Sequence, residues 1–267
     1  MSRADRLSWT IARLVADFPA GTAFTATSSA TLGVMLSQRL FGSRLALCGR
    51  GGAYDLHGIL SLHARHWLFN RRPRAHVQLP GVFDTQSEPH ALLATPAQVD
   101  GASNANLSGI GDQARPKVAF GGTRGLPDAR GLHFVLPGHS PRQLVERVDF
   151  VSTRAASRAQ PSLLITELCV MRWSHDVSAW ELLEIAPEVD LETLRAKTGF
   201  AFAVSPELRL LEAMPEEARV LLPELDPLGM RDLDFISGRV EQLDAFARIY
   251  AAEAAMVGRQ RVPRQAK

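Results

Sequence analysis

The chain has 267 residues, of which 46% are hydrophobic, so it can bury a substantial core as one large α/β domain or two small ones. Its 30 basic and 28 acidic residues leave a formal net charge of only +2, which gives no reason to expect a nucleic-acid binder. Charges are spread through residues 1–18, so we expect neither a signal peptide nor a membrane-spanning helix there, and no membrane role.

Two helices are expected near the start of the chain. Leu7, Ile11 and Val15 recur at helical spacing and predict an amphipathic helix. The hydroxyl side chains of residues 27–29 can cap a second helix, whose buried face begins at Leu32. Hydroxyls and free N–H groups at a helix start suit an anionic group, but they also suit a simple N-cap, and both interpretations remain open.

Residues 44–48, RLALC, predict a buried strand, and the glycines of residues 49–52 predict a tight turn after it. The carboxyl end of a strand in an α/β sheet is where ligands bind, so Cys48 is a candidate catalytic residue. A lone cysteine at the end of an apolar strand is more often a small buried hydrophobic residue, so that interpretation also remains open. The second cysteine, Cys169, lies far away, and neither has the spacing of a zinc site or a disulfide framework, so we expect a cytoplasmic protein.

The stretch of residues 97–125 is polar, rich in glycine and poor in aromatic residues, which is typical of a surface loop that binds a ligand. Its first half offers three amide side chains as candidate binding residues: Gln98, Asn104 and Asn106. Its second half, FGGTRG, combines the guanidinium of Arg124 with the backbone N–H groups of Gly121, Gly122 and Gly125. That combination suits an anion or a developing oxyanion, and a tight turn with a surface arginine is the alternative interpretation.

Residues 54–95 are the least patterned part of the chain. Their histidines match no metal-binding helix motif, so we expect no metal site: His57, His63, His66, His76 and His90. Further along, strands are predicted at residues 132–136 and at residues 163–171, the second continuous enough to be covered on both faces. Three tryptophans fit either the core or the wall of a pocket for a bulky ligand: Trp67, Trp173 and Trp180.

The last third of the chain contains two predicted helices. Asp190 can cap the first, Gly199 is expected to end it as a left-handed stop, and a strand at residues 200–204 follows. A C-terminal helix is expected from about residue 239, followed by a basic tail. Strands that alternate with helices imply a mainly parallel α/β sheet, and the absence of long linkers favours a single domain over residues 1–267.

Several motifs, in consistent order, resemble one family. The strings AQVDGASNANLSGIGDQARPKVAFGGTRG, VLPGHSPRQLVERVDFVSTR, PSLLITELCVM and LDPLGMRD are similar to the beta subunit of the family I coenzyme A transferases, in particular that of the glutaconate CoA-transferases. The likeness covers roughly residues 20–232. It implies a NagB/RpiA/CoA-transferase-like fold, an alpha subunit as obligate partner in a heterodimer or heterotetramer, and a site in the cleft between them. Coenzyme A would arrive as part of an acyl-CoA substrate, with no permanently bound cofactor.

The chain departs from that family at one position. Transferases that it resembles carry a nucleophilic glutamate in a Glu-x-Gly segment at about residues 47–52. This chain has LCGRGG there, and no carboxylate lies between Asp17 and Asp55. Such a transferase needs the carboxylate to attack the thioester, form a mixed anhydride and then carry coenzyme A. The resemblance therefore implies that an acyl-CoA binds but that this covalent shuttle does not operate.

Three functions remain open on this basis. The first is carbon–carbon bond hydrolysis or decarboxylation through a thioester enolate, which Arg124 and backbone N–H groups would stabilise. FGGTRGLP is similar to the glycine-arginine loop of the steroid-ring hydrolases of the family, and a cysteine at position 48 is expected of its decarboxylase-like relatives. The second is CoA transfer between an acyl-CoA and a carboxylate. The third is a non-catalytic subunit that stabilises its partner.

Overall fold

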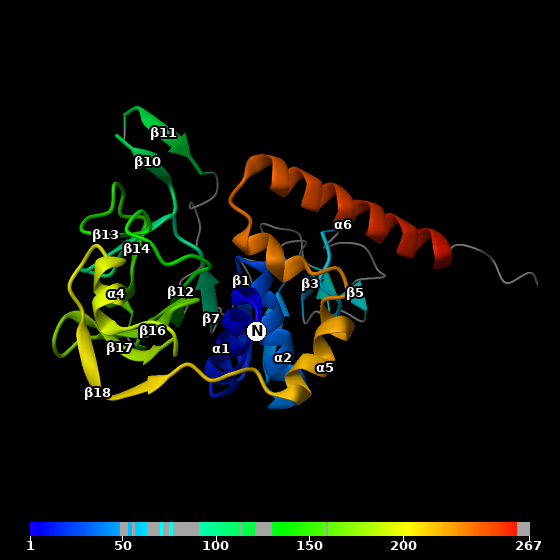
Figure 1. Ribbon diagram of the computed structural model, residues 1–267, viewed down its shortest axis with the longest axis horizontal. Helices are drawn as coiled ribbons and strands as arrows, with labels where there is room; N and C mark the ends of the chain where they lie inside the picture. The colour runs from blue at the N-terminus through cyan, green and yellow to red at the C-terminus, as the bar shows by residue number, and fades with distance from the viewer. Residues whose placement is uncertain are drawn as a thin grey trace, which may run out of the picture.

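A mainly parallel sheet forms the centre of the protein. The computed structural model describes residues 1–48, 53–54, 57–62, 70–71, 75–76, 91–112, 114–120, 130–158 and 160–260. Its main sheet has ten strands in the order β18-β17-β16-β15-β12-β7-β1-β2-β3-β6 (Figure 1). Strand β1 pairs in parallel with β2 and β7, and β12 pairs in parallel with β7 and β15. The α/β class predicted from the alternation of strands and helices is confirmed.

The described strands form one large sheet and three smaller ones. The main sheet contains β1 (Gly21–Thr25), β2 (Leu45–Cys48), β3 (Ala53–Tyr54), β6 (Ala75–His76), β7 (Ala91–Ala94), β12 (Gly131–Leu136), β15 (Leu163–Thr166), β16 (Cys169–Ser174), β17 (Ala179–Ile185) and β18 (Ala203–Leu210). The smaller sheets contain β4 (His57–Gly58), β5 (Asn70–Arg71), β8 (Gln98–Asp100), β9 (Asn104–Asn106), β10 (Gly109–Gly111), β11 (Pro116–Ala119), β13 (Leu144–Val145) and β14 (Thr153–Arg154). The helices are α1 (Arg3–Ala16), α2 (Ser28–Leu40), η1 (Ala155–Ser157), α4 (Leu191–Ala196), α5 (Glu216–Leu225), η2 (Met230–Phe235) and α6 (Arg239–Gln260).

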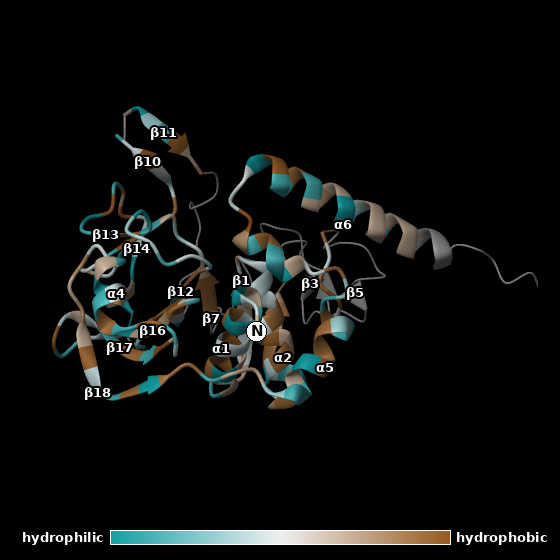
Figure 2. Ribbon diagram, viewed as in Figure 1, coloured by the Kyte–Doolittle hydropathy of each residue, from teal (hydrophilic) through white to brown (hydrophobic). Residues whose placement is uncertain are grey.

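The main sheet carries a hydrophobic core on each face. Adjacent residues of one strand point to opposite faces, so Leu93 of β7 joins the core beneath α1 and α2, while its neighbour Leu92 joins the other core. Figure 2 shows hydrophobic residues concentrated on α2 and β7 in the middle of the molecule. In the second core the rings of Trp173 and Trp180 pack edge to face with centroids 5.5 Å apart. Both tryptophans are therefore core residues, whereas Trp67 lies outside the described residues.

Helices α1 and α2 pack closely because α2 contains a glycine at their contact. A Cβ atom on Gly33 would lie 2.7 Å from Cγ2 of Ile11 and 2.9 Å from the carbonyl oxygen of Ser8. Replacing Gly33 by valine is therefore expected to push the helices apart and lower the free energy of unfolding by roughly 1–3 kcal/mol. Urea unfolding of the purified chain measures the change. Gly138→Val is the comparison, since a Cβ there meets only the side-chain end of Gln143, and equal losses would contradict the packing argument.

The prediction of a surface loop for residues 97–125 is wrong where the structure describes it. Residues 98–119 form β8, β9, β10 and β11 in two small sheets. Gln98, Asp100 and Asn106 are buried although they are polar. The strands are only three or four residues long, so no alternating pattern marks them, and their polar side chains are buried because they bond one another.

Three predictions in the second half are corrected in detail. The run at residues 163–171 is a hairpin of β15 and β16, not one strand, and it turns at Glu167. Gly199 does not have a left-handed backbone; it is required because a Cβ there would lie 2.3 Å from the carbonyl oxygen of Leu144. The strand expected at residues 200–204 begins later, as β18. The N-cap at Asp190 is confirmed by a 2.6 Å hydrogen bond from the backbone N–H of Thr193.

The C-terminal helix turns only part of its apolar surface inward. Figure 1 shows α6 as a long helix that extends beyond the sheet. Ala245, Ile249 and Glu253 are buried on one face. Four large apolar residues of the helix are instead largely exposed: Val240, Leu243, Phe246 and Tyr250.

Candidate active site

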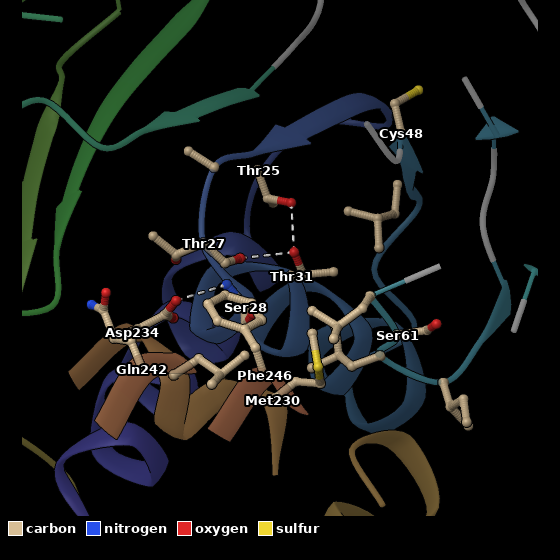
Figure 3. Close-up of a pocket in the computed structure, with 16 residues that line it drawn as sticks. Thr25, Thr27, Ser28, Thr31, Cys48, Ser61, Met230, Asp234, Gln242 and Phe246 are labelled. Atoms are coloured by element: carbon tan, nitrogen blue, oxygen red, sulfur yellow. Dashed lines mark hydrogen bonds between the residues drawn. The ribbon is translucent and has the colours of Figure 1, made fainter. Parts of the chain in front are cut away.

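A pocket lies at the carboxyl ends of β1 and β2, where ligands bind in open α/β sheets. Its volume is about 510 Å³. The start of α2, the segment after β4 and the C-terminal elements η2 and α6 complete its walls (Figure 3). The lining residues are Thr25, Ala26, Thr27, Ser28, Thr31, Leu47, Cys48, Ile59, Leu60, Ser61, Leu62, Met230, Leu233, Asp234, Gln242 and Phe246.

Cys48 is the last residue of β2 and lines this pocket. It is paired in parallel register with Phe24 of β1, so it lies beside Thr25 at the same edge of the sheet. Only 5% of its surface is exposed, and its sulfur lies at the rim of the drawn pocket in Figure 3. The structure thus places the sequence candidate at a strand end that faces a cavity.

A chain of hydroxyl groups runs along the polar side of the pocket. The hydroxyl of Thr31 donates to the carbonyl oxygen of Thr27 at 2.8 Å and lies 2.8 Å from Oγ1 of Thr25. A hydroxyl has a single proton, and that of Thr31 is already used, so Thr25 must be the donor in their shared bond. Thr25 is therefore left with lone pairs, and it can accept a hydrogen bond from a water molecule or a substrate donor.

The start of α2 is closed by two side chains from this protein. Oγ1 of Thr27 accepts from the backbone N–H of Ala30 at 3.1 Å, which confirms the N-cap interpretation. The carboxylate of Asp234 accepts from the backbone N–H of Ser28 at 3.2 Å and of Ser29 at 2.7 Å. The N–H groups that could hold an anionic ligand thus already hold a carboxylate.

A buried ionic network fixes η2, which supplies Met230, Leu233 and Asp234 to the pocket. The guanidinium of Arg231 donates to Asp226 at 2.8 Å and to Asp5 of α1 at 2.7 Å. Asp226 is fully buried and also accepts from the backbone N–H of Met230 at 2.6 Å. Asp226, Met230 and Arg231 lie in the LDPLGMRD motif. The bond from Arg231 to Asp5 ties η2 to α1.

The rest of the pocket lining is largely apolar. Leu47 comes from β2, Leu60 and Leu62 from the segment after β4, and Met230 and Leu233 from η2. Phe246 of α6 adds an aromatic ring. A pocket with one hydroxyl-lined side and one apolar side suits a small acyl group whose carbonyl end is polar.

The amide candidates of residues 98–106 lie outside this pocket and bond one another. Oε1 of Gln98 accepts from Nδ2 of Asn106 at 2.8 Å and from the backbone N–H of Asp149 at 3.0 Å. Asn106 also closes the turn to Gly109, and Asn104 bonds the buried carboxylate of Asp100. These side chains hold the small sheet together. The glycine-arginine loop lies outside the described residues: Gly121, Gly122, Arg124 and Gly125.

A second polar cluster lies at the carboxyl ends of β12 and β15, and none of its residues lines the pocket. The ring of His139 lies between the hydroxyls of Thr166, 3.0 Å away, and Thr198, 2.9 Å away. Burial, assisted by Lys197, lowers the pKa of His139 to about 4, and burial raises the pKa of the Cys169 thiol to about 12. Burial also raises the pKa of Glu167, which Arg3 opposes. A neutral imidazole beside a neutral thiol is a structural arrangement, since an activated cysteine needs a lowered pKa.

The described residues contain no group of three or more His, Cys, Asp or Glu side chains that could hold a metal ion. Within that same part of the chain, no helix is long and apolar enough to cross a membrane.

No family model matches the sequence. Among proteins of known function, the chain is 24% identical over 147 residues to the beta subunit of glutaconate CoA-transferase of Acidaminococcus fermentans, covering 49% of this chain and 55% of the relative. It is 28% identical over 147 residues to the beta subunit of 3-oxoadipate CoA-transferase of Pseudomonas knackmussii, covering 49% and 54%. The chain thus spans about half the length of these relatives.

Solved structures are similar over most of their length. The decarboxylase AibA/AibB matches with a TM-score of 0.73 and 23% identity, over 86% of this chain and 97% of that chain. Glutaconate coenzyme A-transferase of Acidaminococcus fermentans matches with a TM-score of 0.74 and 16% identity, over 86% and 97%. IpdAB of Rhodococcus jostii RHA1 matches with a TM-score of 0.74 and 18% identity, over 89% and 99%.

The fold and the pocket at its strand ends define an α/β protein of the CoA-transferase-like class. Within that class, the chain is similar in sequence to the beta subunits of coenzyme A transferases. The predicted fold class is confirmed, and so is the predicted resemblance to these subunits.

The sequence did not indicate most of the pocket. Asp234, Gln242 and Phe246 come from the C-terminal elements, about two hundred residues after the strand ends that they face. Besides the strand end at Cys48, the local signal was the hydroxyls of residues 27–29, which mark the wall that Asp234 closes.

Proposed function

We propose that this chain is the beta subunit of a two-subunit enzyme that cleaves a carbon–carbon bond of an acyl-CoA, by hydrolysis or decarboxylation. The observation that carries the proposal is Cys48, which lines the pocket at the end of β2, where a transferase of this family would carry its glutamate. Among the described lining residues Asp234 is the only carboxylate, and it is bonded to the start of α2. A glutamyl-CoA intermediate therefore has no candidate residue in this part of the pocket.

The side chains of the pocket fit reaction through a thioester enolate. The apolar side holds the acyl chain and excludes water, which strengthens electrostatic interactions inside the pocket. Thr25 is an acceptor, so it suits a water molecule or a protonated group and not an oxyanion. The thiol of Cys48 is a weak donor that can bond the enolate or the departing group. Arg124 is proposed as the cation that stabilises the enolate.

One finding about another protein supports this choice. The decarboxylase AibA/AibB, a structural neighbour, has been solved with four different replacements of one cysteine. The sequence relatives, in contrast, are named as transferases, so CoA transfer remains the second candidate function. The exposed apolar side chains of α6, including Leu243 and Tyr250, fit contact with the proposed alpha subunit.

The test uses this chain co-expressed with its alpha subunit and a panel of acyl-CoAs, with and without acetate, with products followed by mass spectrometry. The expected result is loss of CO₂ or gain of water that does not depend on acetate. Acetate-dependent formation of acetyl-CoA, or a CoA adduct on a glutamate of this chain during turnover, would contradict the proposal. Absence of any turnover with the partner present would favour a non-catalytic subunit.

Replacing Cys48 tests whether its thiol takes part in turnover. Cys48→Val removes the donor and is expected to reduce kcat of the complex by roughly 10²-fold, whereas Cys48→Ser keeps a donor and is expected to lose less. Cys169→Ala is the control, because that thiol is buried in the separate polar cluster. Steady-state kinetics of the three complexes measure the difference. Equal kcat values for Cys48→Val and the unmodified complex would exclude a role for the thiol.

A further inference from the structure

Asp234 brings a fixed negative charge to one wall of the pocket. Its carboxylate lines the cavity and accepts hydrogen bonds from the backbone N–H groups of Ser28 and Ser29 at the start of α2. Helix α2 has 13 residues, so its N-terminus is a position that attracts an anionic group. Here the protein fills that position with its own side chain.

The position of this carboxylate is held from several sides. Asp234 belongs to η2, which the bonds of Arg231 to Asp5 and Asp226 anchor to α1. Gln242, a neighbour of Asp234 in Figure 3, donates to the carbonyl oxygen of Ile236 at 2.6 Å, just after η2. A carboxylate fixed in this way cannot easily give its place to a ligand, because both N–H groups would lose an acceptor.

A second anion at this wall would meet two costs. It would find the backbone donors of Ser28 and Ser29 already bonded, and it would lie beside a like charge. Like charges placed together in an interface cost several kcal/mol, and a site can gain specificity from such a repulsive element. The adjacent side chains of Leu233 and Phe246 offer an uncharged group a favourable environment instead.

We propose that Asp234 is a specificity-determining residue that selects acyl-CoAs whose acyl group is uncharged at its far end. This inference rests on the proposed binding of an acyl-CoA in the pocket, with its thioester end toward Cys48. A terminal carboxylate would be directed to the wall formed by α2 and η2, where Asp234 repels it. Figure 3 shows Cys48 and Asp234 far apart along the pocket. The bond that is cleaved lies at the thioester end near Cys48, so a carboxylate lost in decarboxylation would be one carried on the carbon next to the thioester.

The test compares two CoA thioesters of equal chain length, 2-pentenoyl-CoA, which ends in a methyl group, and glutaconyl-CoA, which ends in a carboxylate. Calorimetry on the complex with the alpha subunit is expected to show at least about tenfold tighter binding of 2-pentenoyl-CoA. Asp234→Asn and Asp234→Ser remove the charge, and the ratio is expected to fall to about threefold or less. Asp232→Asn removes the same charge from an exposed position of η2 and should keep the original ratio.

Each outcome decides a separate point. Affinity for 2-pentenoyl-CoA that stays near the unmodified value shows that a variant is folded, and the serine variant keeps a residue type that can cap α2. If the unmodified complex binds both thioesters equally, or if the ratio is the same after Asp234→Asn and Asp234→Ser, the specificity role is wrong while acyl-CoA binding stands. If neither thioester binds the unmodified complex, the proposed function fails and this inference fails with it.

Discussion

Replacing Asp226 by alanine is expected to lower the free energy of unfolding by about 3–5 kcal/mol, because it leaves Arg231 without its buried partner. The side chain of Asp226 is fully buried, and that of Arg231 is 16% exposed. The same carboxylate accepts from the backbone N–H groups of Met230 and Arg231, so three donors lose an acceptor in the variant.

The effect should reach the pocket as well as the stability. Asp226 lies just before η2, and that short helix supplies Met230 and Asp234 to the pocket. Without Asp226, the start of η2 loses the acceptor of two backbone N–H groups, so the pocket is expected to bind an acyl-CoA less well even at temperatures where the chain remains folded. Urea unfolding of the chain and calorimetric titration of its complex with 2-pentenoyl-CoA measure the two losses separately.

A surface ion pair on the neighbouring helix is the matched control. Glu224 of α5 lies 2.7 Å from Arg39, and both side chains are about half exposed. Glu224→Ala is expected to cost less than about 1 kcal/mol, since water screens exposed pairs. If Asp226→Ala cost no more than Glu224→Ala, the buried network would not be what holds η2 in place.

The elements that sequence reasoning predicted well depend on short-range signals. The first two helices follow from helical spacing and from the hydroxyl of Thr27, and the start of α4 follows from Asp190. The hairpin of β15 and β16 was hidden because both strands are buried on both faces, so their residues form one apolar run. Glu167 interrupts that run, and it marks the turn.

Only part of the pocket could be predicted from the sequence, because some of its residues have local signals and others depend on distant contacts. Cys48 could be found because a short apolar strand and a glycine turn stand next to each other in the chain. The role of Asp234 depends on a contact between residues 206 positions apart, and no local pattern distinguishes it from other acidic residues near the C-terminus. The amide residues Gln98 and Asn106 show the converse, because polar residues in a glycine-rich stretch can be internal supports.

Stability is expected to fall as the pH drops from about 6.5 to about 4, because two buried histidines resist protonation. Burial lowers the pKa of His133 to about 4, and burial assisted by Lys197 lowers that of His139 to about 4. Nδ1 of His133 accepts from the backbone N–H of Leu163 at 3.2 Å, so protonation there would break a hydrogen bond as well as bury a charge. Phe18 stacks on the same ring at a centroid distance of 4.7 Å.

The hydrogen bonds of His139, the second histidine, favour its neutral form. Thr198 donates its proton to the carbonyl oxygen of Leu194 at 2.8 Å, so Nε2 of His139 must donate to Thr198. Nδ1 is then an acceptor for the hydroxyl of Thr166. A second ring proton would force the hydroxyl of Thr166 to turn away from Nδ1, toward the carbonyl oxygen of Cys169 at 3.4 Å.

The sign of the pH effect follows from the two states. The unfolded chain takes up protons on both histidines below about pH 6.5, whereas the folded chain does so only near pH 4, so acid favours unfolding over this interval. Each histidine should contribute a loss on the order of 3 kcal/mol by pH 4. Glu167 titrates in the opposite sense, since its raised pKa favours the folded state in acid, so each variant must be compared with the unmodified chain.

His133→Gln keeps a hydrogen-bond acceptor but cannot be protonated in this range, so it isolates one of the two contributions. Urea unfolding at half-unit steps from pH 7 to pH 4 should show a shallower decline for this variant than for the unmodified chain, even if its stability at pH 7 is lower. Parallel declines would mean that His133 is protonated in the folded state, and its buried contact with Phe18 and Leu163 would then have to open in acid.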